Sequence, residues 1–191
     1  MLNDASFSFI DRVKEIQLNI EDRRFQSALA LALTIPDICG GIAFPDQYKR
    51  HRDGKIILDK FKNPARDTGG QYVRWFDEYA AQYFKLSPDD ENSYICGKRC
   101  WQLRCEYLHQ NKGFLNNEDD DDVRFHLGVN CGTSVCQRDP DEHHNPMDIH
   151  IDIKEFCLRM TYAALDYYNN EQGNKNFDLY NTPVLDFMPI I

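Results

Sequence analysis

One segment of the chain, residues 91–110, places apolar side chains on almost every side of the helix that its spacing predicts. A helix of this kind lies at the centre of its fold or in an interface between subunits. The sequence Asn111-Lys112-Gly113 predicts where the helix ends. Other elements of the chain, or a second subunit, must therefore pack around it. Its apolar residues are Tyr94, Ile95, Cys96, Cys100, Trp101, Leu103, Cys105, Tyr107 and Leu108.

Four other segments, at about residues 6–20, 22–41, 70–85 and 152–170, have the apolar periodicity of an amphipathic helix. The second of them contains Pro36, so we expect a kink or restart there and an end near Gly40 and Gly41. Asp152, with Glu155 three residues later, predicts the N-terminal cap of the last helix.

Two short segments have the alternation of β-strands instead. Residues 123–129 alternate between apolar and polar side chains, and residues 149–151 do so again. We expect these two strands to pair. The predicted fold is therefore mainly α, a bundle of four to five helices with a small β-hairpin inserted before the last long helix. Residues 1–172 are predicted to form a single helical domain, followed by a loosely attached tail at residues 173–191.

The composition is that of a globular protein. Of the 191 residues, 42% are hydrophobic, which is enough for one domain with a core. No apolar run approaches the roughly 20 residues that cross a bilayer, and Asp4 argues against a secretory signal at the start. The seven cysteines, an odd number, suit a reducing compartment in which cysteine acts as a small buried hydrophobic residue. We therefore expect a soluble cytoplasmic protein without membrane contact.

The formal net charge of −9 limits how this chain can bind nucleic acid. Non-specific coating of nucleic acid rests on many Lys and Arg contacts to phosphate, which this composition does not offer. An RNA partner would be bound over a small area or presented by another protein. Lys49, Arg50 and Arg52, which flank His51, are the candidate RNA-binding residues, although a short basic loop is more often ordinary surface.

The central helix ends in a pair of residues suited to phosphate chemistry, Arg104 and His109. Arginine can grip a phosphate through two parallel hydrogen bonds, and histidine transfers protons near neutral pH. On a straight α-helix, five positions place the two side chains about 140° apart. They converge only if the helix ends near His109 or if a symmetric partner supplies one of them. Otherwise Arg104 pairs with an acid and His109 with a buried backbone carbonyl.

Residues 104–109, Arg-Cys-Glu-Tyr-Leu-His, lie late in a core helix of a small helical protein and resemble the R-x4-6-H signature of the HEPN superfamily. The resemblance implies a helical bundle that forms a homodimer through the motif helix and needs no metal or other cofactor. It also implies an endoribonuclease of a toxin–antitoxin, phage-defence or RNA-processing system. RNA would be the substrate, and an antitoxin protein is a candidate partner.

The resemblance gives the site residues their roles. His109 would act as general base on a ribose 2′-OH or as general acid to the leaving 5′-oxygen. Arg104 would bind the scissile phosphate and stabilise its developing charge. The product would carry a 2′,3′-cyclic phosphate. Glu106 and Gln110 flank the pair and would orient it, although solvated surface is the simpler interpretation of either.

A second interpretation is a catalytically inactive HEPN-like module that binds or scaffolds other molecules as a dimer. Cys105, directly after the arginine, and the acidic net charge favour this module, whereas the Arg104 and His109 pair favours the enzyme.

Two further clusters suggest metal chemistry less strongly. Cys96 and Cys100 share a helical face, and Cys131 and Cys136 lie near three histidines downstream. Their spacing matches no tight zinc pattern, so we assign no metal site. The acidic run at residues 118–122 lacks the alternation and the glycine of a calcium loop, and indicates a solvated loop.

Overall fold

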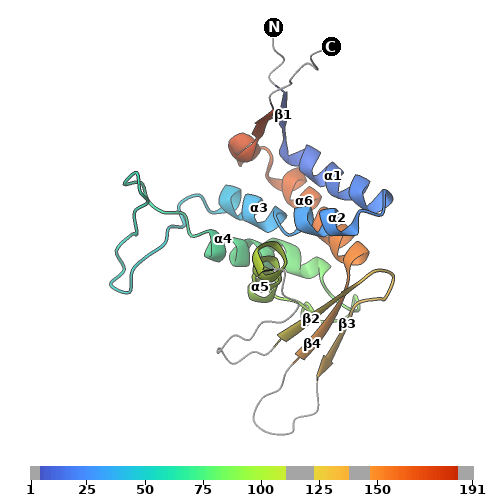
Figure 1. Cartoon of the computed structure of the whole chain (residues 1–191). Helices are drawn as coiled ribbons and strands as arrows, with labels where there is room; N and C mark the ends of the chain where they lie inside the picture. The colour runs from blue at the N-terminus through green and yellow to red at the C-terminus, as the bar shows by residue number, and fades with distance from the viewer. Residues whose placement is uncertain (1–4, 111–122, 138–146, 185–191) are drawn as a thin grey trace.

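The computed structural model describes residues 5–110, 123–137 and 147–184 and shows a helical body with a small sheet at either end (Figure 1). Helix α6 contacts α1, α2, α3 and strand β4 (Met147–Asp152), so it runs through the centre of the body. The α-helices of the described ranges are α1 (Phe9–Glu21), α2 (Phe25–Ala32), α3 (Ile35–Ala43), α4 (Thr68–Trp75), α5 (Gly97–Cys105) and α6 (Ile153–Glu171).

Two of these helices continue as π-helical turns, in which each hydrogen bond spans five residues instead of four. Helix α4 passes into the π turn η1 (Phe76–Ala80) and the 3-10 turn η2 (Ala81–Tyr83), so these three elements fill the predicted helix at 70–85. Helix α5 passes into the π turn η3 (Glu106–Gln110). Its start lies later than predicted because the Gly97 N–H donates a hydrogen bond to Asp77 Oδ1 of η1 (2.6 Å).

The predicted caps and breaks hold in part. Asp152 Oδ1 accepts a hydrogen bond from the Glu155 N–H (3.1 Å), which confirms the cap of α6. The Asp152 N–H donates to Thr133 Oγ1 (3.3 Å) instead of closing a capping box. Pro36 lies in the first turn of α3, directly after the break between α2 and α3, as predicted. Ser8 caps α1, which begins at Phe9 and so a little later than the predicted start near residue 6.

The predicted helical bundle with a β-hairpin is wrong. Strands β2 (Val123–Gly128), β3 (Ser134–Gln137) and β4 form a three-stranded mixed sheet in the order β2-β4-β3. The two predicted strands do pair, but they run parallel, and β3 runs antiparallel on the other side of β4. Alternation assigns a residue to one face of a sheet and says nothing about the direction of the neighbouring strand. A hairpin was therefore one of several pairings that the pattern allowed.

A second, two-stranded sheet lies at the other end of the body, where β1 (Ala5–Phe7) pairs antiparallel with β5 (Thr182–Val184). The 3-10 turn η4 (Phe177–Tyr180) precedes β5. The Phe177 ring is buried, and its centre lies 5.2 Å from the Phe9 ring centre. Residues 177–184 are thus fastened to the N-terminal part of the chain.

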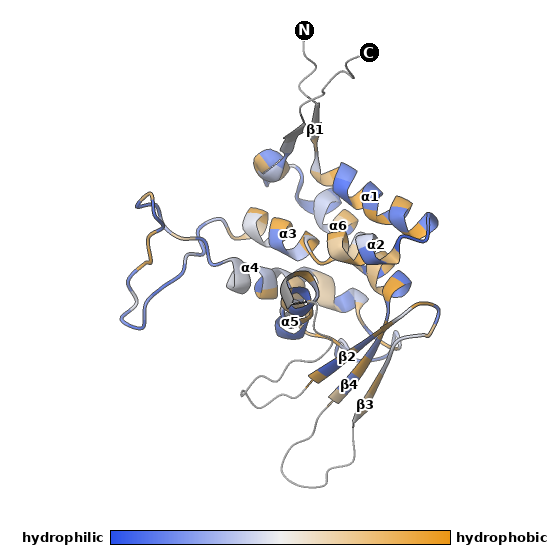
Figure 2. Cartoon of the chain, viewed as in Figure 1, coloured by the Kyte–Doolittle hydropathy of each residue, from blue (hydrophilic) through white to orange (hydrophobic). Residues whose placement is uncertain are grey.

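One continuous core joins α1 to the apolar face of the three-stranded sheet. Apolar residues are frequent along α2, α3 and α6 (Figure 2), and many of them belong to this core. The Phe84 ring touches those of Phe76 and Phe156, with centres 4.9 and 5.1 Å apart. The largest side chains with no exposed surface in this core are Tyr72, Trp75, Phe76, Phe84 and Phe156.

Helices α2 and α3 together make an apolar stretch, Phe25–Ala43, whose 19 residues are enough by length and hydropathy to cross a membrane. The sequence prediction overlooked this stretch. Of its most apolar window, 56% is buried inside the protein, and Leu29, Leu33 and Ile35 have no exposed surface. Burial of this extent is typical of the core helices of soluble proteins.

Residues 44–67 form an irregular protruding segment, here called the basic ribbon, which extends away from the helical body (Figure 1). Its residues are mostly exposed and hydrophilic (Figure 2). An antiparallel bridge between Tyr48 and Arg66 closes its base, and two further bridges, Arg50 to Ile56 and Leu58 to Pro64, close two separate turns.

Candidate functional site

Arg104 lies in the last turn of α5, and its side chain reaches α3. Its Nη2 atom is 3.4 Å from Asp37 Oδ2, and its guanidinium carbon is 4.7 Å from the centre of the Trp101 ring. The side chain is 16% exposed. Arg104 therefore pairs with an acid, which is one of the two arrangements that the sequence allowed. A small part of its side chain remains exposed to solvent.

Asp37 joins this arginine to a second one. Its Oδ1 atom is 3.0 Å from Nη2 of Arg66, which lies just before α4. Arg66 is fixed by hydrogen bonds that its Nε donates to Gln71 Oε1 and its Nη2 donates to the Asp37 carbonyl. We call this set of Asp37, Arg66 and Arg104 the Asp37 bridge. It ties α3, α4 and α5 together at the place where the motif lies.

The sequence pointed to Arg104 but not to its partners. Asp37 was predictable only as a helix-capping residue after Ile35, because an acid in a first helical turn is ordinary. Arg66 follows a proline in a polar loop and gave no signal of its own.

The backbone of His109 belongs to the π turn η3. A π turn closes through hydrogen bonds that span five residues, and Arg104 and His109 are five positions apart. The part of the segment from Glu106 onward therefore departs from the α-helical spacing on which the 140° separation is based. The side chains of His109 and Gln110 are not among those that the structure describes.

Glu106, the first residue of η3, is buried and only 4% exposed. Its Oε1 atom has no hydrogen-bond partner among the described residues. Burial raises the pKa of this carboxyl from 4.5 to about 7, because ionisation would leave a charge in a poorly solvated site. The interpretation of Glu106 as solvated surface is wrong. Near neutral pH this carboxyl can hold or release a proton.

The basic ribbon carries the predicted RNA-binding residues Lys49, Arg50 and Arg52, all of them exposed. Arg50 Nη1 donates a hydrogen bond to the Gly54 carbonyl (2.9 Å), which braces the turn. The sequence prediction missed Phe61, which is 71% exposed near the far end of the same ribbon. Cations and an exposed aromatic ring thus share one protruding element.

The cysteines considered as zinc ligands lie in different environments. Cys100 is buried, and its sulfur lies 3.3 Å from the Tyr72 hydroxyl. Burial raises the pKa of this thiol to about 12, whereas Cys96, Cys131 and Cys136 are exposed. Among the residues that the structure describes, no group of three or more His, Cys, Asp or Glu side chains is arranged to hold a metal ion. The acidic run at 118–122 lies outside those residues.

A histidine pair on the three-stranded sheet gave no sequence signal. His126 of β2 and His150 of β4 lie opposite each other, and their rings stack with centres 4.5 Å apart. His126 Nε2 is 3.0 Å from Asp148 Oδ1. Only the parallel register brings these residues together, so their sequence spacing could not reveal them.

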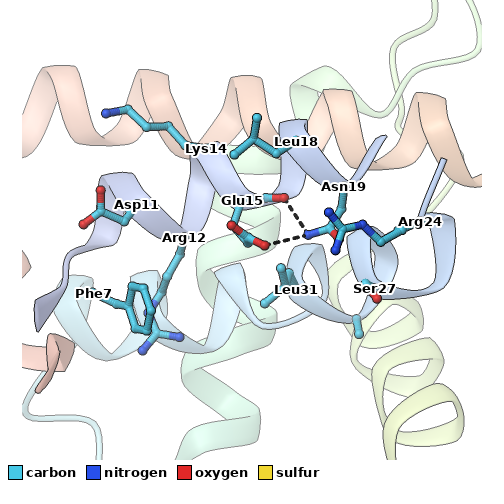
Figure 3. A pocket seen from close by; sticks show the side chains of 11 residues that line it. Phe7, Asp11, Arg12, Lys14, Glu15, Leu18, Asn19, Arg24, Ser27 and Leu31 are labelled. Atoms are coloured by element: carbon cyan, nitrogen blue, oxygen red, sulfur yellow. Dashed lines mark hydrogen bonds between the residues drawn. The ribbon is translucent and has the colours of Figure 1, made fainter. Parts of the chain in front are cut away.

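A groove of about 910 Å³ runs between α1 and α2. Phe7 and Arg12 lie together at one end of it, and the side chain of Asn19 turns back onto its own helix (Figure 3). Asn19 Nδ2 donates to the Glu15 carbonyl (2.7 Å) and to Glu15 Oε1 (3.2 Å). The groove is thus lined by apolar and charged side chains. Its described lining includes no histidine, and so no pair of arginine and histidine like that of the motif.

Comparison with protein-family models, curated proteins and solved structures found no match.

Proposed function

We propose that this protein is a HEPN-like cytoplasmic endoribonuclease that cleaves RNA without metal through Arg104 and His109. The observation that supports the proposal best is the change from α-helix to π-helix inside the motif. On an uninterrupted α-helix, the two residues would point in directions about 140° apart. A turn that closes over five residues reduces this separation, and π turns occur frequently at functional sites.

The proposed reaction is an internal transfer of the phosphodiester. His109 removes the proton from the ribose 2′-OH, whose oxygen then attacks the phosphorus atom. The bond to the 5′-oxygen breaks, and that oxygen leaves with a proton from a general acid. Arg104 stabilises the charge that develops on the phosphate oxygens. The products are a 2′,3′-cyclic phosphate and a 5′-hydroxyl, so DNA is not a substrate.

The basic ribbon is the proposed RNA-binding arm. Lys49, Arg50 and Arg52 supply cations, and Phe61 offers a ring on which a base can stack. Binding through one protruding element fits a chain with a net charge of −9, because the contact area on RNA stays small. A homodimer formed through α5, or an antitoxin protein, would complete the presentation of RNA.

The cleavage test uses the full chain, a single-stranded RNA and EDTA. The expected product is RNA with cyclic-phosphate ends, formed by the wild type and lost in both Arg104→Ala and His109→Ala. Arg24→Ala, which removes a 60% exposed arginine at the N-terminus of α2, serves as the control and should cleave normally. Circular dichroism must show that all variants are folded. Cleavage that survives in His109→Ala excludes this mechanism.

The binding arm has its own test. Replacing Lys49, Arg50 and Arg52 together by Gln should weaken RNA binding and lower the slope of log K against log salt by roughly 2, since each phosphate contact on single strands contributes about 0.7. A control variant removes three exposed lysines elsewhere, Lys14, Lys98 and Lys154, and should bind nearly as the wild type does. Equal losses of RNA binding in the two variants would mean that the effect comes from the change in net charge alone.

The second candidate function is a catalytically inactive HEPN-like module, and the Asp37 bridge favours it. Arg104 is only 16% exposed and already faces a carboxylate, so a phosphate would have to compete with Asp37. Asp37→Asn separates the two functions. If Asp37 orients Arg104 for catalysis, this variant cleaves RNA more slowly. If Asp37 blocks Arg104, the variant binds RNA more tightly and gains no cleavage.

A further inference from the structure

A hollow of about 390 Å³ lies beside the Asp37 bridge, where α1, α3, η4 and β5 meet. Its size falls in the range of roughly 300–1,000 Å³ that is usual for small-molecule sites. Its charged and hydroxyl-bearing walls are Arg12, Thr34, Asp37, Arg66, Tyr180 and Thr182.

The charge balance around this hollow is positive. Arg12 and Arg66 line it. The Asp37 carboxylate pairs with both Arg66 and Arg104. The hollow is therefore lined by two guanidinium groups and one carboxylate, in a chain whose net charge is −9. A local excess of cations against the charge of the whole chain favours an anionic ligand.

The two arginines keep donors that can reach a ligand. Of the five N–H donors of a guanidinium, Arg66 directs its Nε at Gln71 and its Nη2 at Asp37. Among the described residues, its Nη1 takes part in no hydrogen bond. Arg12 donates a hydrogen bond from Nη2 to Thr182 Oγ1. Its other nitrogens also take part in no hydrogen bond among the described residues. A tetrahedral anion with several acceptor oxygens can use donors arranged in this way.

Gly41 of α3 allows the walls to close. A Cβ atom at this position would lie 2.7 Å from Arg66 Nη2 and closer still to the Tyr180 hydroxyl. The guanidinium of Arg66 also sits over the Tyr180 ring, 5.1 Å from its centre. Any larger residue at position 41 would push both groups away from the helix. The absence of a side chain there is what brings a cation and a hydroxyl to the same wall.

We propose that this hollow binds a phosphate monoester, carried either by a free nucleotide or by the 5′ end of an RNA. The site goes beyond the proposed function, because its ligand is held by Arg12, Arg66 and the hydroxyl groups and requires no cleavage. Arg104 is not among the residues that line the hollow.

Isothermal titration calorimetry of the full chain tests the proposal, with inorganic phosphate as the first probe. Arg12→Gln should weaken phosphate binding about tenfold or more, which corresponds to the loss of one hydrogen bond to a charged group. Tyr180→Phe should weaken it by a smaller factor. Arg24→Gln is the matched control, because Arg24 lines the groove between α1 and α2 and not this hollow. It should bind phosphate as the wild type does.

Two further probes distinguish the sources of the phosphate. Binding of AMP identifies a free nucleotide. Binding of a 5′-phosphorylated oligoribonucleotide, but not of its 5′-hydroxyl form, identifies an RNA end. His109→Ala should bind all probes normally, so failure of cleavage and failure of this site are separable. The proposal is overturned if phosphate does not bind saturably, or if folded Arg12→Gln and Arg24→Gln bind it equally.

Discussion

Individual polar groups of this protein show how strongly position changes chemistry. Glu91 precedes α5 in the chain and is exposed to solvent. Glu106 directly follows α5 and is buried, and its Oε1 atom accepts no hydrogen bond from the described residues. Asp37 and Asp53 both pair with cations, yet the first is enclosed by two arginines and the second faces one exposed lysine. Each contrast supplies a variant and its control.

The first prediction concerns pH. Below about pH 4.5 the Glu106 carboxyl is protonated in the folded and the unfolded chain, so it adds no pH dependence. Between pH 4.5 and about 7 the unfolded chain ionises first, because the folded pKa is about 7. The free energy of unfolding therefore falls as pH rises through this window and is constant above it.

Glu106→Gln removes this loss. The variant should gain stability over the wild type between pH 5 and pH 8 by up to about 3 kcal/mol, measured by urea unfolding at each pH. Glu91→Gln should follow the wild-type profile. If Glu106→Gln does the same, the carboxyl is not buried in its protonated form.

The second prediction concerns the Asp37 bridge. Asp37→Asn leaves two partly buried guanidinium groups without their carboxylate, and should lower the free energy of unfolding by about 2 kcal/mol. Breaking a fully buried pair costs about 3–5 kcal/mol, and these side chains are 16–29% exposed. Asp53→Asn, whose lysine partner is 80% exposed, should leave the free energy of unfolding almost unchanged, because solvent screens an exposed ion pair. Similar losses in urea unfolding would refute a structural role for the bridge.

At the scale of elements, α3, α4 and α5 approach one another closely where they cross at glycine. A Cβ atom on Gly40 of α3 would lie 2.5 Å from the Gln71 carbonyl oxygen of α4, and one on Gly97 of α5 would lie 2.9 Å from Val73 Cα. Both neighbours are backbone atoms, which cannot rotate away. These two crossings set the distances of α3 and α5 from α4, and hence the position of Arg104 relative to Asp37.

The third prediction follows from this packing. Gly40→Ala should lower the free energy of unfolding by about 1–3 kcal/mol, because overpacking forces the two helices apart. Gly173→Ala, where a new Cβ would meet nothing within 4 Å, should be neutral or slightly stabilising. Thermal unfolding of both variants checks this. An unchanged melting temperature in Gly40→Ala would mean that α3 and α4 separate at no cost.

The sequence predicted the elements whose signals are local and regular. The stripe of α1, the cap of α6 at Asp152 and the break at Pro36 need only neighbouring residues. The π turns η1 and η3 escaped prediction because a single turn with a longer period leaves too few residues to show it. The start of α5 escaped because it is fixed by Asp77, a residue 20 positions away.

At the scale of the whole molecule, the order β2-β4-β3 makes β4 the central strand of the sheet. Its backbone is hydrogen-bonded on both sides, whereas β2 and β3 each keep one edge without a neighbouring strand in the described sheet. Helix α6 follows β4 directly and crosses the core. Strand β4 and α6 thus form one continuous segment that runs from the centre of the sheet through the core.

The fourth prediction is that amide hydrogens of Ile149 and Ile151 exchange with solvent more slowly than those of β2 and β3. Both side chains have no exposed surface, and slow exchange marks the part of a protein that opens last. Hydrogen–deuterium exchange with mass spectrometry measures it, with the exposed basic ribbon as the fast reference. Equal exchange across the three strands would contradict the strand order.

The sequence predicted the helical body, the two alternating strands and the place of Arg104 near the end of a helix, because each depends on a pattern within one segment. Strand direction, the His126 and His150 stack and the pairing of Arg104 with Asp37 depend on which distant segments meet. Glu106 was misread because a lone acid in a helix is usually solvated, and nothing local marks its burial.

The strand order also bears on how the protein is made. During synthesis β2 and β3 leave the ribosome before β4, and in the final sheet neither is the other's neighbour. Until Met147–Asp152 has emerged, both strands lack their native partner, and unpaired strand edges invite association with other chains. A polypeptide stopped short of residue 147 would therefore be prone to aggregate.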